Sequence, residues 1–150
     1  MPRPRLLLLA ATSLLALAAC DAQPTEPEAR VTLTADTGAP TSLHIDGAWR
    51  VACPVTLRAS AVGGSLAWTG GTLVFRSAGS GALLRTVPLD RDVAADVLGG
   101  AEISRGETLV SSLDLWADEP FELQGSFTYR SAGRESAASV SLRCAPSATP

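Results

Sequence analysis

The chain's one histidine lies two residues before an aspartate, and these side-chain types can carry out acid–base or metal chemistry. His44 and Asp46 would share one face of a strand, where they could bind a metal or act as a general base and its orienting carboxylate. No third ligand of the usual type is close in the sequence, and Asp46-Gly47 is a common turn dipeptide. We therefore interpret Asp46 as a turn residue and expect no metal site and no cofactor.

A second concentration of carboxylates occurs in the segment LDRDVAAD. Asp90, Asp92 and Asp96 are dense enough to bind calcium. However, Arg91 separates the first two, and the glycine that a calcium loop requires is missing. Asp92 is also placed to cap a helix, so capping is the simpler interpretation of this cluster.

Three tryptophans could stack on sugar rings. Trp49 alternates with apolar residues, which predicts a position in the core. Trp116 lies on the polar side of its segment and precedes an acidic turn, so it is the best candidate for an exposed aromatic side chain, although packing in the core or at an edge is the simpler interpretation. The candidate ligand-binding residues are therefore Trp116, Asp118 and Glu119.

The motifs of common enzyme classes are missing from the sequence. No glycine pair is followed by the Lys-Ser or Lys-Thr of a phosphate loop, and no Gly-x-Ser-x-Gly occurs. The net charge of −3 leaves no basic stripe for phosphates, so we expect no nucleic-acid partner. We predict that the protein is not an enzyme. A small hydrolase with an unrecognised site is the alternative, because sandwich folds can host chemistry.

The N-terminus carries the features of an export signal. Arg3 and Arg5 precede an uncharged, mostly apolar run over residues 6–19, which is shorter than the roughly 20 residues that span a bilayer. The run ends in Leu-Ala-Ala-Cys, which resembles the lipobox of bacterial lipoproteins. The resemblance implies a signal peptide over residues 1–19, cleavage before Cys20 and a diacylglycerol on the Cys20 sulfur. An ordinary secretory signal with a coincidental cysteine is the alternative.

The residues after Cys20 have the composition of a spacer. Two or more acyl chains hold a protein stably on a membrane, so the resemblance implies a lipid anchor in the bacterial cell envelope, facing the periplasm or the exterior. Asp21 resembles the signal that keeps lipoproteins on the inner membrane of enteric bacteria. The segment up to Ala29 has two prolines and no large apolar side chain, which predicts a tether over residues 20–29.

The two remaining cysteines, Cys53 and Cys144, form an even pair, which in an exported protein suggests a disulfide. Both alternate with apolar residues, so both are expected on the core-facing sides of strands. The bond would join an early strand to the last one and close a loop of about 90 residues, contributing roughly 4 kcal/mol in the chain-entropy model. Two free buried thiols are the alternative.

The rest of the chain is organised in short alternating segments with glycine-containing turns between them. Residues 92–98 differ, because they have helical spacing, with Asp92 as the N-cap candidate and Gly99 as the stop. Pro54 predicts a bulge or an edge position, and Gly70-Gly71 predicts a turn. The strands expected from the alternation are 30–35, 42–45, 48–60, 65–69, 72–77, 82–89, 108–116, 121–131 and 135–144.

About seven to nine short strands predict an all-β fold, a two-sheet antiparallel sandwich over residues 30–145 followed by a tail at 146–150; a small barrel is the alternative. The pattern resembles the immunoglobulin-like and fibronectin-like sandwiches of bacterial envelopes. Trp68 lies 15 residues after Cys53, which is similar to the Cys-to-Trp spacing of immunoglobulin domains. The sequence departs from that family at Leu142, where the family has a tyrosine, and at Cys144, which ends the last strand.

Together these features predict a non-catalytic binding or accessory module of the cell envelope. It would contact another envelope protein by a sheet edge or by loops, since a free edge can accept an added strand. The alternative is a carbohydrate-binding or cell-wall-binding module that uses Trp116 and the acids near it.

Overall fold

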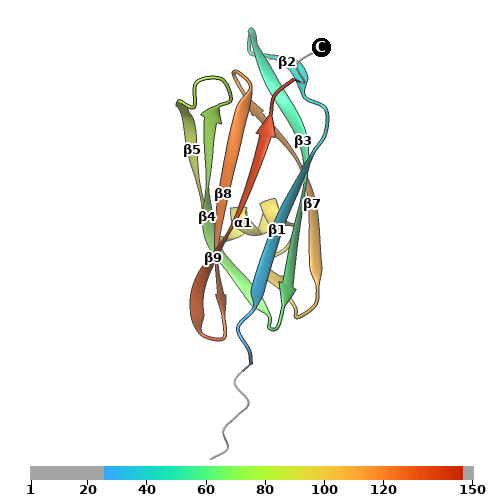
Figure 1. Cartoon of the computed structure of the whole chain (residues 1–150), viewed down its shortest axis with the longest axis vertical. Coiled ribbons are helices and arrows are strands. Elements are labelled where there is room, and N and C mark those ends of the chain that lie inside the picture. The colour runs from blue at the N-terminus through green and yellow to red at the C-terminus, as the bar shows by residue number, and fades with distance from the viewer. Residues whose placement is uncertain (1–25, 147–150) are drawn as a thin grey trace, which may run out of the picture.

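The computed structural model describes residues 26–146, so the expected signal peptide, Cys20 and most of the C-terminal tail lie outside the described residues. Within residues 26–146, no helix is long and apolar enough to cross a membrane. In this described part of the chain, nine strands and one helix follow one another (Figure 1). They are β1 Arg30–Thr37, β2 Thr41–Ile45, β3 Ala48–Val62, β4 Leu66–Ser77, β5 Leu83–Leu89, α1 Arg91–Leu98, β6 Glu102–Ile103, β7 Thr108–Ala117, β8 Phe121–Ser131 and β9 Arg134–Cys144.

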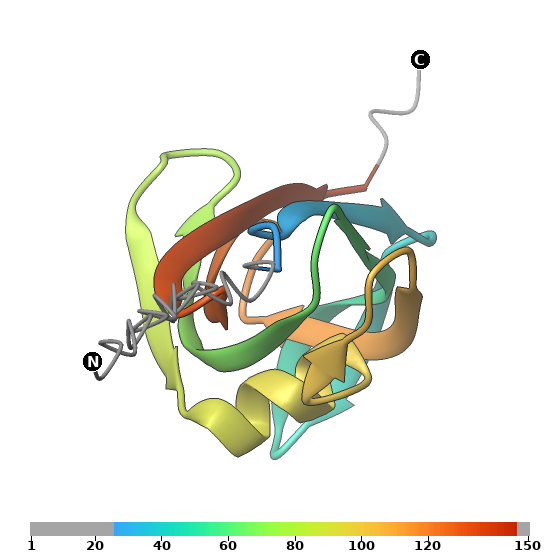
Figure 2. The ribbon, with the colours of Figure 1, turned by 90° about the horizontal axis from the view of Figure 1, so that it is seen from below.

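The strands form two antiparallel sheets that pack face to face, which confirms the predicted sandwich. In the first sheet, the long strand β3 pairs with β7 along one edge, while β2 and then β1 pair along its other edge. The second sheet has the order β5-β4-β8-β9, and the short strand β6 also pairs with β4. The sandwich is closed at the sides, because β1 lies beside β9, and α1 packs against β4 and β7 (Figure 2).

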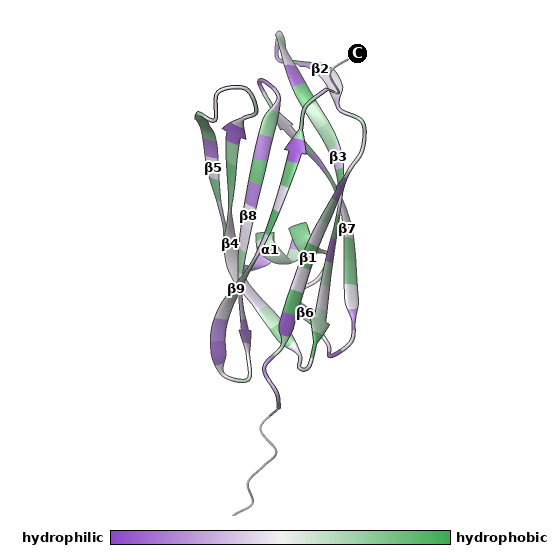
Figure 3. Ribbon diagram, viewed as in Figure 1, coloured by the Kyte–Doolittle hydropathy of each residue, from purple (hydrophilic) through white to green (hydrophobic). Residues whose placement is uncertain are grey.

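The strands form because apolar side chains alternate with polar ones along each of them. In β8, burial alternates almost without interruption, so one side of the strand enters the core and the other faces solvent. The same alternation is visible as stripes of hydropathy along β8 (Figure 3). Fully buried side chains from both sheets and α1 fill the interior, and the largest are Trp68, Phe75, Phe121, Phe127, Leu98, Ile103 and Val55.

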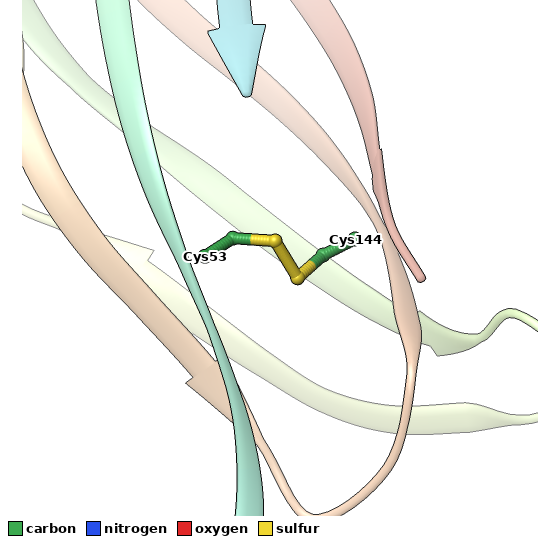
Figure 4. The surroundings of a disulfide bond; sticks show 2 residues. All are labelled: Cys53 and Cys144. Carbon is green, nitrogen blue, oxygen red and sulfur yellow. A yellow bond between two sulfur atoms is a disulfide. The ribbon is translucent and has the colours of Figure 1, made fainter. Parts of the chain in front are cut away.

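The Cys53–Cys144 disulfide is present, as the sequence predicted, and joins β3 to the end of β9 across the core (Figure 4). The two Cα atoms are 6.0 Å apart, within the usual range for a disulfide. Trp68 lies near the other end of the core, where its ring packs edge-on against Tyr129 at a centroid distance of 5.7 Å. Trp68 therefore does not pack on the disulfide as the tryptophan of an immunoglobulin domain does.

Pro54 lies within β3, an interior strand, and the pairing of β3 with β7 runs past it without a bulge. It is tolerated because the other edge of β3 is vacant at this point, where β1 has ended and β2 has not begun. The Pro54 carbonyl accepts a hydrogen bond of 2.8 Å from the Gly38 N–H. The Pro54 nitrogen faces the same side, where no ladder hydrogen bond is lost. Pro54 therefore lies at a short unpaired stretch along one edge of an interior strand, and not in an edge strand.

Two local expectations are wrong. Gly70-Gly71 is not a turn, because β4 runs unbroken through both residues and the irregularity is a bulge between Trp68 and Gly70 in its pairing with β8. The N-cap of α1 is Asp90 and not Asp92; the Asp90 carboxylate accepts a hydrogen bond of 2.9 Å from the Val93 N–H. The helix ends at Gly99 as expected, where a positive φ of 84° favours glycine.

The described part of the segment expected as a tether contacts the sandwich. Ala29 is buried and its N–H donates a hydrogen bond of 2.8 Å to the Ser131 hydroxyl. Glu28 accepts a hydrogen bond of 3.1 Å from Ser136 and lies 3.9 Å from the Arg134 guanidinium. The packed part of the chain therefore includes residues 26–29, at the end of the molecule opposite the β2–β3 hairpin (Figure 1).

Candidate functional site

Trp49 is on the surface, contrary to the prediction of a core position. Its exposed fraction is 69%, although it is on the same side of β3 as the buried Cys53. The reason is that β9 ends at Cys144, which is bonded to Cys53, so the β2–β3 hairpin, to which Trp49 belongs, extends past the end of β9 (Figure 1). Trp49 has the His44 ring beside it, at a centroid distance of 5.1 Å.

Trp116 lies on the outer side of β7 near the same end of the molecule, with an exposed fraction of 36%. Two guanidinium groups lie against its indole ring. The Arg50 Cζ atom is 4.4 Å from the ring centroid, and the Arg85 Cζ atom is 4.6 Å from it. Both distances are those of cation–π contacts, so the indole and the two cations hold one another in place.

The two arginines reach Trp116 from different sheets. Arg50 comes from β3 and pairs with Asp118, whose Oδ1 atom is 3.4 Å from the Arg50 Nε. Arg85 comes from β5, lies over the Phe75 ring at 4.2 Å, and donates a hydrogen bond of 2.5 Å to the Trp116 carbonyl oxygen. Arg85 thus bridges the edges of the two sheets.

Burial lowers the pKa of the Arg85 guanidinium below its ordinary value, the positive charge of Arg50 adds to this lowering, and Asp118 opposes it. The charged form of Arg85 is therefore less well stabilised than that of an arginine in water.

A hollow of about 90 Å³ lies next to these groups and is lined by Leu84, Arg85, Trp116, Ala117 and Asp118. We call Arg50, Leu84, Arg85, Trp116 and Asp118 the Trp116 site. Of the three residues predicted from the sequence, the structure brings Trp116 and Asp118 together. Glu119 instead lines a different hollow, of about 430 Å³, beside Pro120 and the β4–β5 turn.

The other candidate groups do not assemble into a site. His44 packs beside Trp49, whereas Asp46 is in the β2–β3 turn with a φ of 50° and is followed by Gly47 with a φ of 78°, as in a type I′ turn. Asp90 caps α1, and Asp92 and Asp96 are exposed on it. Within residues 26–146, no three residues of the types His, Cys, Asp and Glu are grouped so that they could hold a metal ion.

A wider depression of about 470 Å³ lies on the second sheet, across β4, β8 and β9. Its charged members are Arg76, Glu122 and Arg143, of which Glu122 and Arg143 pair with each other at 3.3 Å. It is open and has no aromatic side chain, so it offers a ligand fewer directed contacts than the Trp116 site.

The fold defines the chain as an antiparallel β-sandwich domain. No family model matches the sequence, and no curated protein matches it. Among solved structures, the chain is similar to the X-ray structure of Northeast Structural Genomics Consortium target SoR45, with a TM-score of 0.61 and 14% identity, over 80% of this chain and 88% of that chain. At this identity the likeness shows the fold alone.

Proposed function

We propose that the protein is a lipid-anchored, non-catalytic binding module of a bacterial cell envelope, and that the Trp116 site is part of its binding surface. The anchor is the diacylglycerol that the lipobox resemblance implies on Cys20. The binding surface is the end of the sandwich that carries Trp116, Arg50 and Arg85.

The observation that carries this proposal is the position of the Trp116 site relative to the N-terminal segment. Residues 26–29 pack at one end of the sandwich, and the β2–β3 hairpin lies at the other (Figure 1). Trp116 lies opposite Ala52, close to the start of β3 and so to the hairpin. A chain anchored through Cys20 would present the Trp116 site away from its membrane. Tryptophan and arginine are also the residue types that are most enriched among energetically dominant contacts in protein interfaces.

The anchor is tested by changing Cys20 to Ser in the full chain and washing membranes with carbonate. We expect the wild-type chain to remain with the membrane and Cys20→Ser to be released, because the thiol that accepts the lipid is gone. Membrane-bound Cys20→Ser protein would contradict the lipid anchor.

The binding surface is tested by capturing the full, tagged chain from detergent-solubilised envelope and identifying the proteins bound to it. We expect a stoichiometric partner that is lost with Trp116→Ala and retained with Val110→Ala. Val110 is a matched control, because it is an exposed apolar residue on the same outer side of β7. A partner retained equally by both variants would place the binding surface elsewhere.

A second candidate function is carbohydrate binding, and the observation that favours it is the exposed ring of Trp49. Trp116 is less suited to stacking on a sugar, because both of its neighbouring cations lie against the ring. Quenching of tryptophan fluorescence by cell-wall oligosaccharides that disappears in Trp49→Phe and persists in Trp116→Phe would support this function. No quenching, in a folded and oxidised chain, would exclude Trp49 as a sugar platform for those oligosaccharides.

A further inference from the structure

Arg85 is the cation in the Trp116 site that has no carboxylate partner among the residues that the structure describes. Within residues 26–146, the ion pair of the site joins Arg50 to Asp118, and the hydrogen bond of Arg85 goes to the uncharged carbonyl of Trp116. The site thus holds two guanidinium cations and one carboxylate, which leaves a net positive charge.

The Arg85 guanidinium also has donors left over. A guanidinium carries five N–H donors, and the Arg85 Nη2 atom uses one of them on Trp116. The Arg85 Nε atom is buried and has no hydrogen-bond partner among the described residues. The Arg50 Nε atom of the same site is likewise buried without a hydrogen-bond partner in the described residues. Because the Arg85 Nε atom is covered by protein, a ligand in the hollow would meet the terminal Nη groups of Arg85, of which one donor is used on Trp116.

The hollow beside Arg85 has the size and lining for a ligand that accepts hydrogen bonds from these donors. Its volume of about 90 Å³ is several times the roughly 10–15 Å³ that one water molecule requires, so a carboxylate group fits. Leu84, Trp116 and Ala117 are the apolar residues among those that line it. A charge pair beside apolar residues is screened less than one in open solvent.

We propose that this hollow binds a carboxylate group, which pairs with Arg85 beside the apolar residues Leu84 and Trp116. Arginine is the residue best suited to this task, because its fork of N–H groups matches both oxygens of a carboxylate. The inference rests on the proposed binding function and names its ligand chemistry. The carboxylate could come from an acidic polypeptide or from an acidic polysaccharide.

The test uses the full chain in neutral detergent and two polymers, poly-L-glutamate and polygalacturonate, which present carboxylates on a polypeptide and on a polysaccharide. The readout is the indole N–H resonance of Trp116, assigned from its loss in Trp116→Phe. We expect this resonance to shift saturably with at least one polymer while that of the buried Trp68 stays in place. The polymer with the higher affinity identifies the source of the carboxylate.

Two variants should change the affinity in opposite directions. Arg85→Gln removes the pairing cation and should weaken binding at least about tenfold, which is the fold-change of a lost charge-assisted hydrogen bond. Asp118→Asn removes the competing carboxylate at the rim and should tighten binding severalfold. Arg105→Gln is the matched control, because Arg105 is an exposed arginine in the β6–β7 loop at the other end of the domain, and it should bind as the wild type does.

The inference would be overturned if neither polymer gave a saturable shift. It would also be overturned if Arg85→Gln and Arg105→Gln lost affinity equally, because equal losses would indicate general attraction to polyanions. If Arg85→Gln does not fold, the opposite effect of Asp118→Asn still decides the matter, and unchanged affinity in that variant counts against the site. A partner lost with Trp116→Ala, in a protein that binds neither polymer, would contradict this inference and leave the binding function standing.

Discussion

Trp68 and Trp49 are the same residue type in opposite environments. Trp68 has no exposed surface and packs against Tyr129 and Phe127, while Trp49 is exposed over 69% of its surface. Trp68→Ala should lower the free energy of unfolding by about 3–5 kcal/mol, because it opens a cavity in the core. Trp49→Ala should change it by about 0.5 kcal/mol or less, as expected of an exposed position. Denaturant unfolding of the oxidised chain measures both.

The Trp68 indole also has a buried N–H without a hydrogen-bond partner in the described residues. Trp68→Phe removes this N–H together with part of the ring, so its cost should be clearly smaller than that of Trp68→Ala. Equal destabilisation by Trp49→Ala and Trp68→Ala would contradict the burial assigned to the two rings.

The surroundings of Trp49 and Trp116 depend on how the two sheets end and pack, which the sequence pattern of a single strand does not show. Alternation correctly places Trp49 and Cys53 on one side of β3, but it does not reveal that β9, in the opposite sheet, ends at the cysteine bonded to Cys53. The pairing of Arg50 and Arg85 around Trp116 was not predicted, because the residues come from three strands and meet only after both sheets have packed. An arginine flanked by apolar residues at the inner side of an edge strand is the one signal that could have pointed to Arg85.

The Asp90 side chain caps the N-terminal end of α1. Asp90→Ala removes the acceptor for the Val93 N–H and should lower the free energy of unfolding by about 0.5–2 kcal/mol. Asp92→Ala is the matched control, since this carboxylate in the first turn makes only a weaker interaction with the helix dipole, worth about 0.3–1 kcal/mol. Thermal unfolding at low ionic strength compares them, and a larger loss with Asp92→Ala would mean that the helix begins elsewhere.

At the scale of elements, most strands and the helix were predictable, because each buries one side and shows the corresponding period. The continuity of β4 through Gly70-Gly71 was not predictable from the sequence. Paired glycines occur in turns and in bulges alike, and only the pairing with the neighbouring strand distinguishes the two. Gly71 occupies its place in β4 because a Cβ atom there would come within 2.6 Å of the Ser126 carbonyl oxygen in β8. The strand β6 is too short, at 2 residues, to show any period.

At the scale of the whole molecule, residues 26–29 pack against the end of the sandwich, next to Gly64. A Cβ atom on Gly64 would overlap the Pro27 carbonyl oxygen, so Gly64→Ala should displace residues 26–29 from the sandwich. Trypsin should then cleave after Arg30 faster than in the wild type. Gly79→Ala is the matched control, because a Cβ there meets nothing closer than 3.9 Å, and unchanged cleavage in Gly64→Ala would contradict the packing of this segment.

The disulfide holds the two sheets together over a sequence separation of 91 residues. Replacing both Cys53 and Cys144 with alanine should lower the free energy of unfolding by about 4 kcal/mol, since the unfolded chain regains the freedom that the closed loop denies it. Unfolding with and without reductant measures this, and reductant should have no further effect on the double variant. A wild-type chain that is insensitive to reductant would contradict the prediction.

The antiparallel pairing of β1 with β3 has a mechanical consequence. Arg30 lies opposite Val62 and Thr37 lies opposite Val55, so eight residue pairs connect the N-terminal segment to the strand that carries the hairpin. In the proposed arrangement, with an anchor at the N-terminus and a partner at the hairpin, a pull between the two would be directed along these strands. Since β2 also pairs antiparallel with β3, β1 and β2 follow one another in the same direction along β3, and the pull is carried by their covalent backbone. This backbone is already extended, so the domain would lengthen little under such a load.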